Sequence, residues 1–327
     1  MKQISFADTG FERTRKRTRK RVFLEEMEQV VPWAKLVARV ERHIQRAATG
    51  RPPFATETML RIHFLQQWFG LSDPAMEEAL HDVPLYRSFA GLDVGVERLP
   101  DESTILRFRH FLEAHELAAE ILATVNGQLA DHGLLLKEGT AVDATLIHAP
   151  SSTKNKKRER DPEMHQTRKG NQWYFGMKIH TGVDTASGLV HSVVGTAANV
   201  ADVTRVHELL HGDEQDVFGD AGYQGAHKRQ ETEDLEVRWH IAMRPGKRKA
   251  LDTNRPQDAL IDAIETGKAR IRAVAEHPYR VLKRQFGYTK VRYRGLGKNT
   301  AQIVTLLALS NLWMVRRQLL RKAAEPG

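Results

Sequence analysis

The spacing of apolar residues in the first part of the chain predicts helices. Over residues 22–44 apolar side chains recur three and four positions apart, and Pro32 marks a break. A second apolar run covers residues 59–69. The same spacing predicts three further helices, over residues 75–81, 105–114 and 117–132. A loop that contains Gly91 and Gly95 is expected between the first two of these three. The region is therefore predicted to be a domain of helices joined by loops.

Two of these helices invite comparison with a helix-turn-helix, the DNA-reading motif. The helix over residues 105–114 carries Arg107 and Arg109, and the helix over residues 75–81 precedes it. However, their connection is far longer than the turn of about 3–4 residues that this motif uses. A plain helical packing domain remains the alternative.

The pattern changes to strands after residue 139. A short apolar run over residues 140–147 predicts a first strand, and residues 151–172 are polar and basic, so a long loop is expected there. The elements predicted next are a strand over 173–183, a turn at 184–188, a return strand over 189–196, a helix over 203–210, an apolar segment over 217–222, a strand over 237–243, a helical region over 256–285 interrupted near Gly267 or Pro278, and a last helix over 301–320. This order predicts an α/β fold, in which helices flank a mixed sheet and an all-helical domain precedes it.

Composition narrows the class of protein. The 327 residues are 41% hydrophobic and 28% charged, as in soluble globular proteins. The absence of cysteine excludes disulfides, cysteine-ligated zinc and thiol catalysis, and fits a reducing cytoplasm. Residues 1–10 lack the apolar core of a secretory signal, and the longest apolar run, residues 303–315, is too short to span a bilayer. We expect a soluble protein with no membrane partner.

The formal net charge of +9 favours a polyanionic partner, and nucleic acid is the usual one. Basic residues gather in two runs. The first lies in residues 1–21, expected to form a disordered or weakly helical basic arm, and comprises Arg13, Arg15, Lys16, Arg17, Arg19, Lys20 and Arg21. The second lies in the 151–172 loop and comprises Lys154, Lys156, Lys157, Arg158 and Arg160. Such runs tend to bind phosphates, although a solvated tail and a solvated loop are the alternative.

Two carboxylates stand out because each interrupts a short apolar segment. Asp143 lies within the run over residues 140–147, and Asp220 follows Val217-Phe218-Gly219. Burying an unpaired carboxylate costs roughly several kcal/mol unless a metal ion or a basic partner offsets its charge. Two carboxylates side by side stay ionised only when a cation lies between them, and Mg²⁺ suits oxygen ligands next to a phosphate substrate. A salt bridge to Arg or Lys is the alternative.

A third acid is predicted on the helical region over residues 256–285. Four charged residues there fall on one stripe at spacings of four, four and three: Arg272, Glu276, Arg280 and Lys283. One acid among three bases fits a site where the acid holds a metal ion and the bases hold DNA phosphates. Ordinary ion pairs with Arg272 and Arg280 are the alternative. The competing acids lack such surroundings: Asp184, Asp202, Asp213, Asp216, Asp262 and Glu265.

The histidines offer no better metal site in the sequence. His240 and His277 are isolated, and the chain contains no H-E-x-x-H motif, no G-x-S-x-G elbow and no P-loop. Metalloprotease, serine-hydrolase and P-loop chemistry are therefore not indicated.

The segments around these acids resemble the DDE transposases of the bacterial insertion-sequence five family, whose catalytic domain has a ribonuclease-H-like fold. The similar segments in the second half are VDAT at 142–145, APSSTKN at 149–155, DPEMHQ at 161–166, GNQWYFGMK at 170–178, GDAGY at 219–223, EHPYR at 276–280, YRGL at 293–296 and ALSNLW at 308–313. Those in the helical half are RIHFLQQW at 61–68, LSDPAMEE at 71–78 and PDEST at 100–104. The resemblance covers almost the whole chain.

In this family an Arg lies four residues before the glutamate and a Lys seven residues after it. Arg272 and Lys283 match those places around Glu276. Related families add a Tyr three residues before that Arg, where this chain has Ala269. The departure leaves the metal ligands unaffected.

The resemblance implies phosphoryl transfer on DNA with two Mg²⁺ ions, for which Mn²⁺ substitutes. Asp143 would bridge both ions, and Asp220 and Glu276 would each complete one site. Phosphate contacts near the scissile bond are expected from Arg272, Lys283, Arg280 and Lys178, with His180 beside the last.

The expected organisation is a basic arm over residues 1–21, a helical DNA-binding domain over 22–135 and a catalytic domain over 136–327. The implied partner is double-stranded DNA, as inverted-repeat ends and as target, bound by a homodimer on paired ends at the nucleoid of a bacterial cytoplasm. Two alternatives remain: a ribonuclease-H-like nuclease without strand transfer, and a non-catalytic DNA-binding protein whose acids form structural ion pairs.

Overall fold

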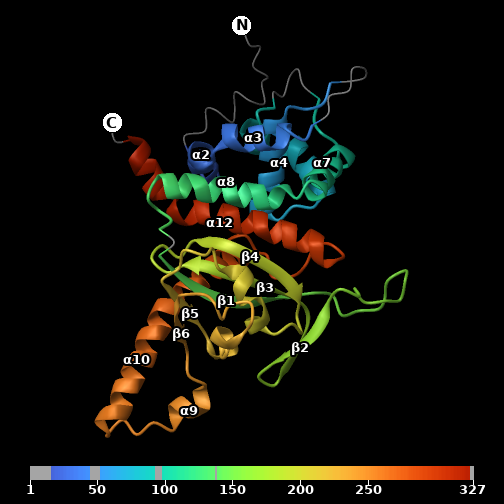
Figure 1. The fold of residues 1–327 in the computed structure, drawn as a ribbon. Coiled ribbons are helices and arrows are strands. Elements are labelled where there is room, and N and C mark those ends of the chain that lie inside the picture. The colour runs from blue at the N-terminus through green and yellow to red at the C-terminus, as the bar shows by residue number, and fades with distance from the viewer. Residues whose placement is uncertain (1–15, 45–51, 93–97, 137, 325–327) are drawn as a thin grey trace. The chain divides into compact units, whose positions relative to one another are not determined.

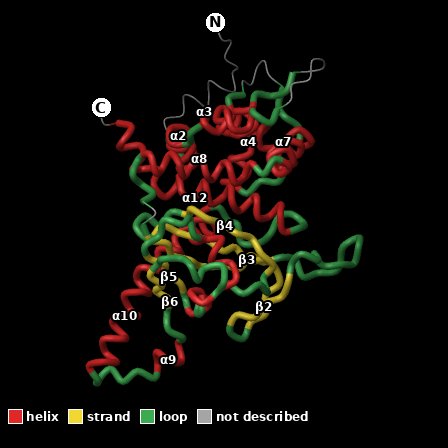
Figure 2. Tube along the Cα trace, viewed as in Figure 1, coloured by secondary structure: helices red, strands yellow, loops and turns green. Residues whose placement is uncertain are grey.

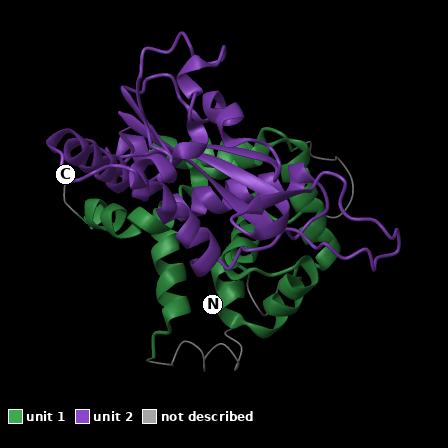
Figure 3. Ribbon diagram, turned by 90° about the horizontal axis from the view of Figure 1, so that it is seen from below, with its two compact units in different colours: residues 1–128, 312–327 green, residues 129–311 purple. Residues whose placement is uncertain are grey.

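The computed structural model describes residues 16–44, 52–92, 98–136 and 138–324 (Figure 1). The chain divides into two compact units, coloured separately in Figure 3. Residues 1–128 with 312–327 form the first, and residues 129–311 form the second. The functional domains expected over 22–135 and 136–327 stay predictions.

The described part of the first unit is built from helices, in agreement with its apolar spacing. They are α2 (Arg19–Val30), α3 (Trp33–Glu41), α4 (Thr56–Phe69), α5 (Asp73–Asp82), α6 (Pro84–Ala90), α7 (Glu102–Ala114) and α8 (Leu117–Asp131), the last of which continues into the second unit. The core of the first unit is aromatic: Phe64 and Trp68 of α4 pack against Trp33 of α3 and Phe89 of α6.

Helix α6 corrects the prediction, because the loop expected between α5 and α7 contains it. Pro84 stands in its first turn, and Gly91 ends it in the left-handed conformation, at φ 71°. The two helices compared with a helix-turn-helix are thus separated by a third helix. They are nevertheless joined by side chains, because Arg109 of α7 forms an ion pair with Asp73 of α5 at 2.8 Å.

The last residues of the expected basic arm belong to helix α2. Thr18 caps the N-terminus of α2, and its hydroxyl accepts a hydrogen bond from the backbone N of Arg21 at 3.2 Å. Residues 19–21, expected to be disordered or weakly helical, form the first turn of α2.

The second unit contains a six-stranded mixed sheet, shown in yellow in Figure 2. Its strands are β1 (Gly139–His148), β2 (His165–Lys169), β3 (Gln172–Asp184), β4 (Val190–Ala197), β5 (Asp216–Gly219) and β6 (Arg238–Ile241). The order is β2-β3-β1-β5-β6, and β4 also pairs with β3. Strand β1 is antiparallel to β3 and parallel to β5, and β5 is parallel to β6. This mixed sheet with flanking helices, after a helical N-terminal region, confirms the predicted α/β class and is consistent with a ribonuclease-H-like fold.

One face of the sheet carries a fully buried apolar cluster. Val142 of β1 and Val217 of β5 pack there against Val206 and Leu209, which belong to the 3₁₀ helix η1 (Asp202–Leu209). Tyr223 completes the cluster. The sequence predicted a helix over residues 203–210, and the structure gives it the tighter 3₁₀ form. Two shorter 3₁₀ turns follow β5, η2 (Ala221–Tyr223) and η3 (Ala226–Lys228).

Strand β2 lies inside the segment predicted to be a loop, so that prediction was wrong for residues 165–169. The strand pairs with β3 across a turn at Gly170, whose φ is 61°. Four of its five residues are exposed and none is buried. The strand therefore has no apolar alternation from which it could be recognised.

The helical region predicted over residues 256–285 forms, but its hydrogen-bonding pattern changes along the way. It comprises α10 (Pro256–Arg272), the 3₁₀ turn η4 (Ala273–Ala275), α11 (Glu276–Arg280) and the π-helical turn η5 (Val281–Gln285). The interruption is thus at residue 273, and neither Gly267 nor Pro278 breaks the helix. In Figures 1 and 2, α10 leads away from the sheet, and α9 (Pro245–Lys249) lies near its far end.

The last helix, α12 (Leu296–Ala324), contains the longest apolar run of the sequence. None of the described helices, α12 included, combines the length and the apolar character that crossing a bilayer requires.

Candidate active site

The pairing of β1 with β5 brings two acids to matching positions. The parallel register ends with Val142 opposite Gly219, and the next residues are Asp143 and Asp220. Neighbouring strands lie about 4.8 Å apart, so the backbones carry the two carboxylates side by side. Asp143 remains within β1 and is paired on its other side with Thr181 of β3.

Asp220 leaves the sheet where it begins the turn η2. Its Oδ1 accepts a hydrogen bond from the backbone N of Gly222 at 2.8 Å. A Cβ at Gly222 would lie 2.9 Å from that oxygen, and one at Gly219 would lie 3.1 Å from the Cβ of Tyr223. Glycine on both sides of Asp220 therefore allows the chain to turn tightly around the carboxylate. Because β5 ends here, β1 has no β5 partner beyond Val142.

Asp143, Asp220 and Glu276 line one pocket, with a volume of about 1100 Å³. Asp143 and Asp220 are half-buried, and Glu276 is exposed. The basic residues that line the pocket are Arg168, Lys169, Lys178, Arg272, Arg280, Lys283 and Arg284, with His277 beside them. The whole predicted stripe of Arg272, Glu276, Arg280 and Lys283 thus faces this pocket, although the helix that carries it is not regular.

The ion pairs offered as alternatives are not formed in the described part of the chain. Neither Asp143 nor Asp220 pairs there with a basic side chain, and Glu276 pairs with neither Arg272 nor Arg280. Burial raises the pKa of Asp143 from 3.8 to about 6; Arg272 opposes the rise, and the negative charges of Asp220 and Glu276 add to it. Carboxylates gathered without a salt bridge are a donor set that suits a divalent cation with oxygen ligands.

Tyr279 attaches α11 to the sheet. Its buried hydroxyl lies 2.7 Å from Thr181 Oγ1 and donates to the carbonyl oxygen of Asp143 at 3.0 Å. Tyr279 thereby bridges β1 and β3 at the residue that carries the first acid, three positions after Glu276. The sequence reasoning did not single out Tyr279, because helical spacing alone cannot distinguish a core aromatic from one that holds a site.

Lys283 is held on β1 as well. Its ammonium group donates to Thr145 Oγ1 at 2.6 Å and to the carbonyl oxygen of Leu146 at 3.1 Å. Burial lowers the pKa of this lysine, Lys169 lowers it further, and Asp143 opposes the shift. Arg272 differs from it, because its Nε is buried and has no hydrogen-bond partner among the described residues.

Lys178 and His180 surround an acid that the sequence reasoning had set aside. Lys178 donates to Asp202 Oδ1 at 2.8 Å and to the carbonyl oxygen of Val200 at 2.8 Å. His180 is buried, lies 3.7 Å from the same carboxylate and contacts Thr196 Oγ1 at 2.8 Å. Burial lowers its pKa to about 4, so the ring is neutral at pH 7. Asp202 is thus a fourth acid of the pocket, although the sequence placed it only among the competing acids.

Part of the basic arm is engaged within its own unit. Arg17 and Arg21 both bind Glu25, and Lys20 donates to the hydroxyl of Tyr86 at 2.9 Å. Lys16 and Arg19 are exposed, while Arg13 and Arg15 lie outside the described residues. In the second run, Lys154, Lys156, Lys157, Arg158 and Arg160 are all exposed.

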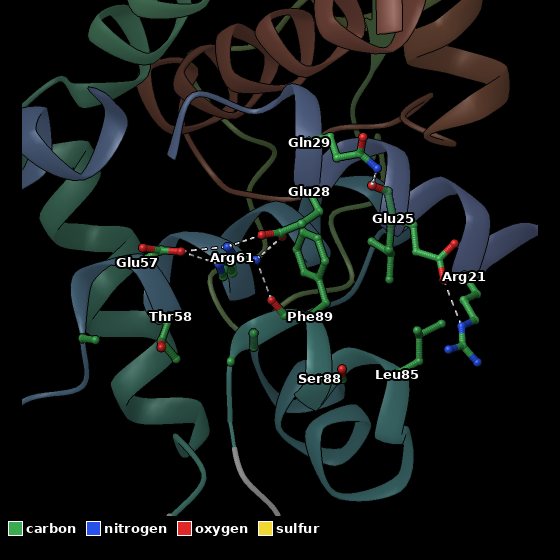
Figure 4. A pocket seen from close by; sticks show the side chains of 14 residues that line it. Arg21, Glu25, Glu28, Gln29, Glu57, Thr58, Arg61, Leu85, Ser88 and Phe89 are labelled. Atoms are coloured by element: carbon green, nitrogen blue, oxygen red, sulfur yellow. Dashed lines mark hydrogen bonds and ion pairs between the residues drawn. The ribbon is translucent and has the colours of Figure 1, made fainter. Parts of the chain in front are cut away.

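A pocket of about 680 Å³ in the first unit lies against the same helix α2 (Figure 4). Arg61 lies at its centre and binds Glu28, Glu57 at 2.7 Å and the carbonyl oxygen of Phe89 at 2.9 Å. The guanidinium also lies over the ring of Trp33, 4.4 Å from its centroid. These charges satisfy one another, so the pocket is a packing feature of the helical unit.

Two predictions about the histidines need correction. His240 is not isolated, because its Nε2 lies 2.7 Å from Asp216 Oδ1 and its ring stacks on Phe218. In addition, His191, His211 and Glu214 come together with their ligand atoms within 4.8 Å of one another. No other group of three such residues in the described part of the chain comes this close together. Asp143, Asp220 and Glu276 do not meet this distance limit. Long separation in sequence concealed the cluster.

Fold and site together describe a ribonuclease-H-like protein with an acidic centre in a basic pocket. The family model of the transposase DDE domain matches residues 135–312, more than half of the chain, and includes all three predicted acids. A second model, described as transposase domain (DUF772), matches residues 12–111. The chain therefore belongs to the DDE transposase family. No solved structure matches it significantly.

Proposed function

We propose that this DDE transposase, of the insertion-sequence five kind, cuts DNA at the inverted-repeat ends of its element and joins the 3′-hydroxyl ends to target DNA. The observation that carries the proposal is the register of β1 and β5, which aligns Asp143 with Asp220 in a pocket that Glu276 also lines. The lack of basic partners at these acids, within the residues that the structure describes, supports a role in binding cations rather than a structural one.

Asp143, Asp220 and Glu276 would hold the two Mg²⁺ ions, for which Mn²⁺ could substitute. When bound, such ions activate an attacking oxygen and stabilise the leaving oxygen of an in-line displacement at phosphorus. Burial raises the pKa of Asp143. The hydroxyl of Tyr279 holds the backbone at the same residue through its hydrogen bond to the carbonyl oxygen.

The bases of the pocket would orient the DNA backbone. Arg272 is the best placed for a phosphate contact, because its guanidinium lines the pocket with Nε unpaired among the described residues. Arg280 is exposed in the same lining. Lys283 and Lys178 already donate to the chain itself, so they hold β1 and Asp202 in position and add positive charge near the phosphate.

The helical unit, the basic arm and the exposed lysines at 154, 156 and 157 would bind the element ends and target DNA. A homodimer on paired ends, acting at the nucleoid of a bacterial cytoplasm, completes the proposal.

The test uses a linear DNA with the element's terminal repeats and a supercoiled target plasmid. The parent chain should cut the ends in Mg²⁺ and insert a pre-cleaved end into the plasmid. Glu276→Gln should lose both activities by roughly 1,000-fold, which corresponds to about 4 kcal/mol of transition-state stabilisation, and should still bind the end DNA. Full activity in Glu276→Gln would place the third ligand elsewhere. Cleavage without insertion by the parent chain would indicate a nuclease that lacks strand transfer.

A further inference from the structure

His191, His211 and Glu214 form a cluster apart from the carboxylate pocket. His191 belongs to β4, and the other two lie between η1 and β5. Their ligand atoms all lie within 4.8 Å of one another. The two imidazole rings are 4.9 Å apart at their centroids and inclined at 77°. Two ring nitrogens and a carboxylate oxygen thus converge from segments that are distant in the sequence.

The side chain of Glu214 is buried, with only 1% exposed, and hydrogen bonds hold its carboxylate in place. Its carboxylate accepts hydrogen bonds from the backbone N of His211 at 2.7 Å, from that of Gly212 at 2.8 Å and from Thr140 Oγ1 at 3.1 Å. In the described residues no Lys or Arg forms an ion pair with it. A buried carboxylate requires a positive partner. The neighbouring histidines can provide it either as a protonated ring or by binding a metal cation.

His211 has an unused nitrogen that is directed at this carboxylate. The side chain is 10% exposed, and Nε2 is buried without a hydrogen-bond partner among the described residues, 3.4 Å from Glu214 Oε1. Its Nδ1 accepts from the backbone N of Asp213 at 3.2 Å and lies 3.9 Å from the carboxylate of that residue. A short movement of the exposed Asp213 would let Nδ1–H donate to it, the usual arrangement for a histidine that binds a metal ion through its other nitrogen.

The ring of His191 occupies space that only glycine leaves open. A Cβ at Gly182 would lie 2.7 Å from Cε1 of the ring and 2.1 Å from the carbonyl oxygen of Leu209. The two ring nitrogens of His191 face hydroxyls, Thr140 Oγ1 at 3.0 Å and Ser192 Oγ at 3.0 Å. Because Thr140 donates its one hydroxyl proton to Glu214, it accepts from Nε2–H of His191, and an ion would bind this nitrogen in place of that proton.

We propose that His191, His211 and Glu214 bind one zinc ion, with water as the remaining ligand. Two imidazoles and one carboxylate suit Zn²⁺, whereas Mg²⁺ prefers oxygen ligands throughout. The ion would join β4 to the segment before β5 and, through Thr140, to the first residues of β1. These strands carry the alignment of Asp143 with Asp220, so the zinc would stabilise the framework of the pocket without taking part in its chemistry. The proposal does not depend on the reaction proposed above.

The experiment titrates the chelator-treated, full-length protein with Zn²⁺ in millimolar Mg²⁺, which occupies oxygen sites. We expect one zinc per chain, and with Co²⁺ in its place a visible absorption typical of four-coordinate geometry. Glu214→Gln and His211→Gln should each weaken zinc binding by about 100-fold or more, since even partners beyond the ligands contribute 10–100-fold. His207→Gln, on the neighbouring η1, is the matched control and should bind zinc like the parent.

Two outcomes would overturn the proposal. One is a parent protein that takes up no zinc, or whose Co²⁺ spectrum shows only six-coordinate geometry. The other is folded Glu214→Gln and His211→Gln proteins, checked by circular dichroism, that bind zinc as tightly as His207→Gln does. The Co²⁺ spectrum of the parent decides the matter if either variant fails to fold. Asp143→Asn should still bind zinc. A failure of the proposed DNA chemistry can therefore be distinguished from a failure of the zinc site.

Discussion

Asp143 and Asp220 occupy matching positions on two parallel strands, each one residue beyond the last backbone pair of β1 and β5. Neither acid has a basic partner among the described residues, and the pKa of Asp143 is raised to about 6, chiefly by burial. Ionisation of Asp143 therefore comes at a cost to the folded state. Four consequences of this arrangement and of its surroundings can be measured.

The first prediction is that Asp143→Asn stabilises the protein in the absence of divalent cations. The pKa of Asp143 rises from 3.8 to about 6 on folding, so between these pH values the folded chain keeps a proton that the unfolded chain has lost. The free energy of unfolding therefore falls as the pH rises from about 4 to about 6, and above pH 6 the whole loss amounts to about 3 kcal/mol. Asparagine does not ionise, so the variant should melt at a higher temperature than the parent at pH 8 in EDTA.

Well below pH 3.8 the side chain at position 143 is neutral in both proteins, folded or unfolded, so their melting temperatures should converge. A variant that melts below the parent at pH 8 would show that the carboxylate stabilises the fold, and that a basic partner neutralises it in solution.

The second prediction concerns the pH dependence of cation binding. Mn²⁺ binds the ionised carboxylate, so below about pH 6 it must displace a proton from Asp143. The affinity should fall about tenfold for each pH unit below this value and should change little above pH 7. Calorimetric titrations at pH 5 and pH 8, each in two buffers of different ionisation enthalpy, would measure both the affinity and the proton released. Equal affinities at the two pH values would exclude Asp143 as a ligand.

The third prediction tests the attachment of α11. Tyr279→Phe removes the hydrogen bonds to Thr181 and to the carbonyl oxygen of Asp143. The buried groups left unpaired should cost about 1–3 kcal/mol of stability, and cleavage should fall because Glu276 is displaced with its helix. Tyr174→Phe is the control, since its hydroxyl donates to the exposed Gln172 and its removal should cost less than about 0.5 kcal/mol. If Tyr279→Phe and Tyr174→Phe lost stability and cleavage to the same extent, Tyr279 would have no special role in positioning Glu276.

The fourth prediction concerns DNA binding by the exposed loop. Replacing Lys154, Lys156 and Lys157 by Gln should reduce the slope of log K against log salt by up to about 2.7, because each phosphate that a lysine no longer neutralises accounts for about 0.9. The decrease in affinity should be similar for all DNA sequences. Lys268→Gln is the control, because Lys268 is paired with Glu265 at 2.8 Å and its removal should leave the slope unchanged. Fluorescence anisotropy at several salt concentrations provides the measurement, and an unchanged slope in the triple variant would mean that the loop stays in solvent.

The sequence was sufficient to identify elements that have a strong apolar pattern. Strand β1, the hairpin of β3 with β4 and the fully buried part of α12 follow from such patterns, because the burial of apolar side chains decides them. Strand β2 and helix α6 do not. The first is a polar edge strand fixed only by pairing with β3, and the second is a seven-residue helix whose ends are set by Pro84 and Gly91.

The site shows the same division. A carboxylate inside an apolar strand is visible in the sequence, and so Asp143 and Asp220 could be named. Their adjacency could not, because it depends on which strands pair and in which register. The partners of Asp202 and the histidine cluster depend on tertiary contacts between distant residues, such as Lys178 with Asp202, which are 24 positions apart. Periodicity carries no information about such contacts.

The contact of Tyr279 with Asp143 also has a consequence for the order of events during synthesis. Both strand acids leave the ribosome well before the segment that carries Glu276 and Tyr279. A growing chain can form the β1–β5 pair early, yet α11 can dock on it only afterwards. The nascent protein thus gains its third acid last, and its sheet can fold while the centre is still chemically incomplete.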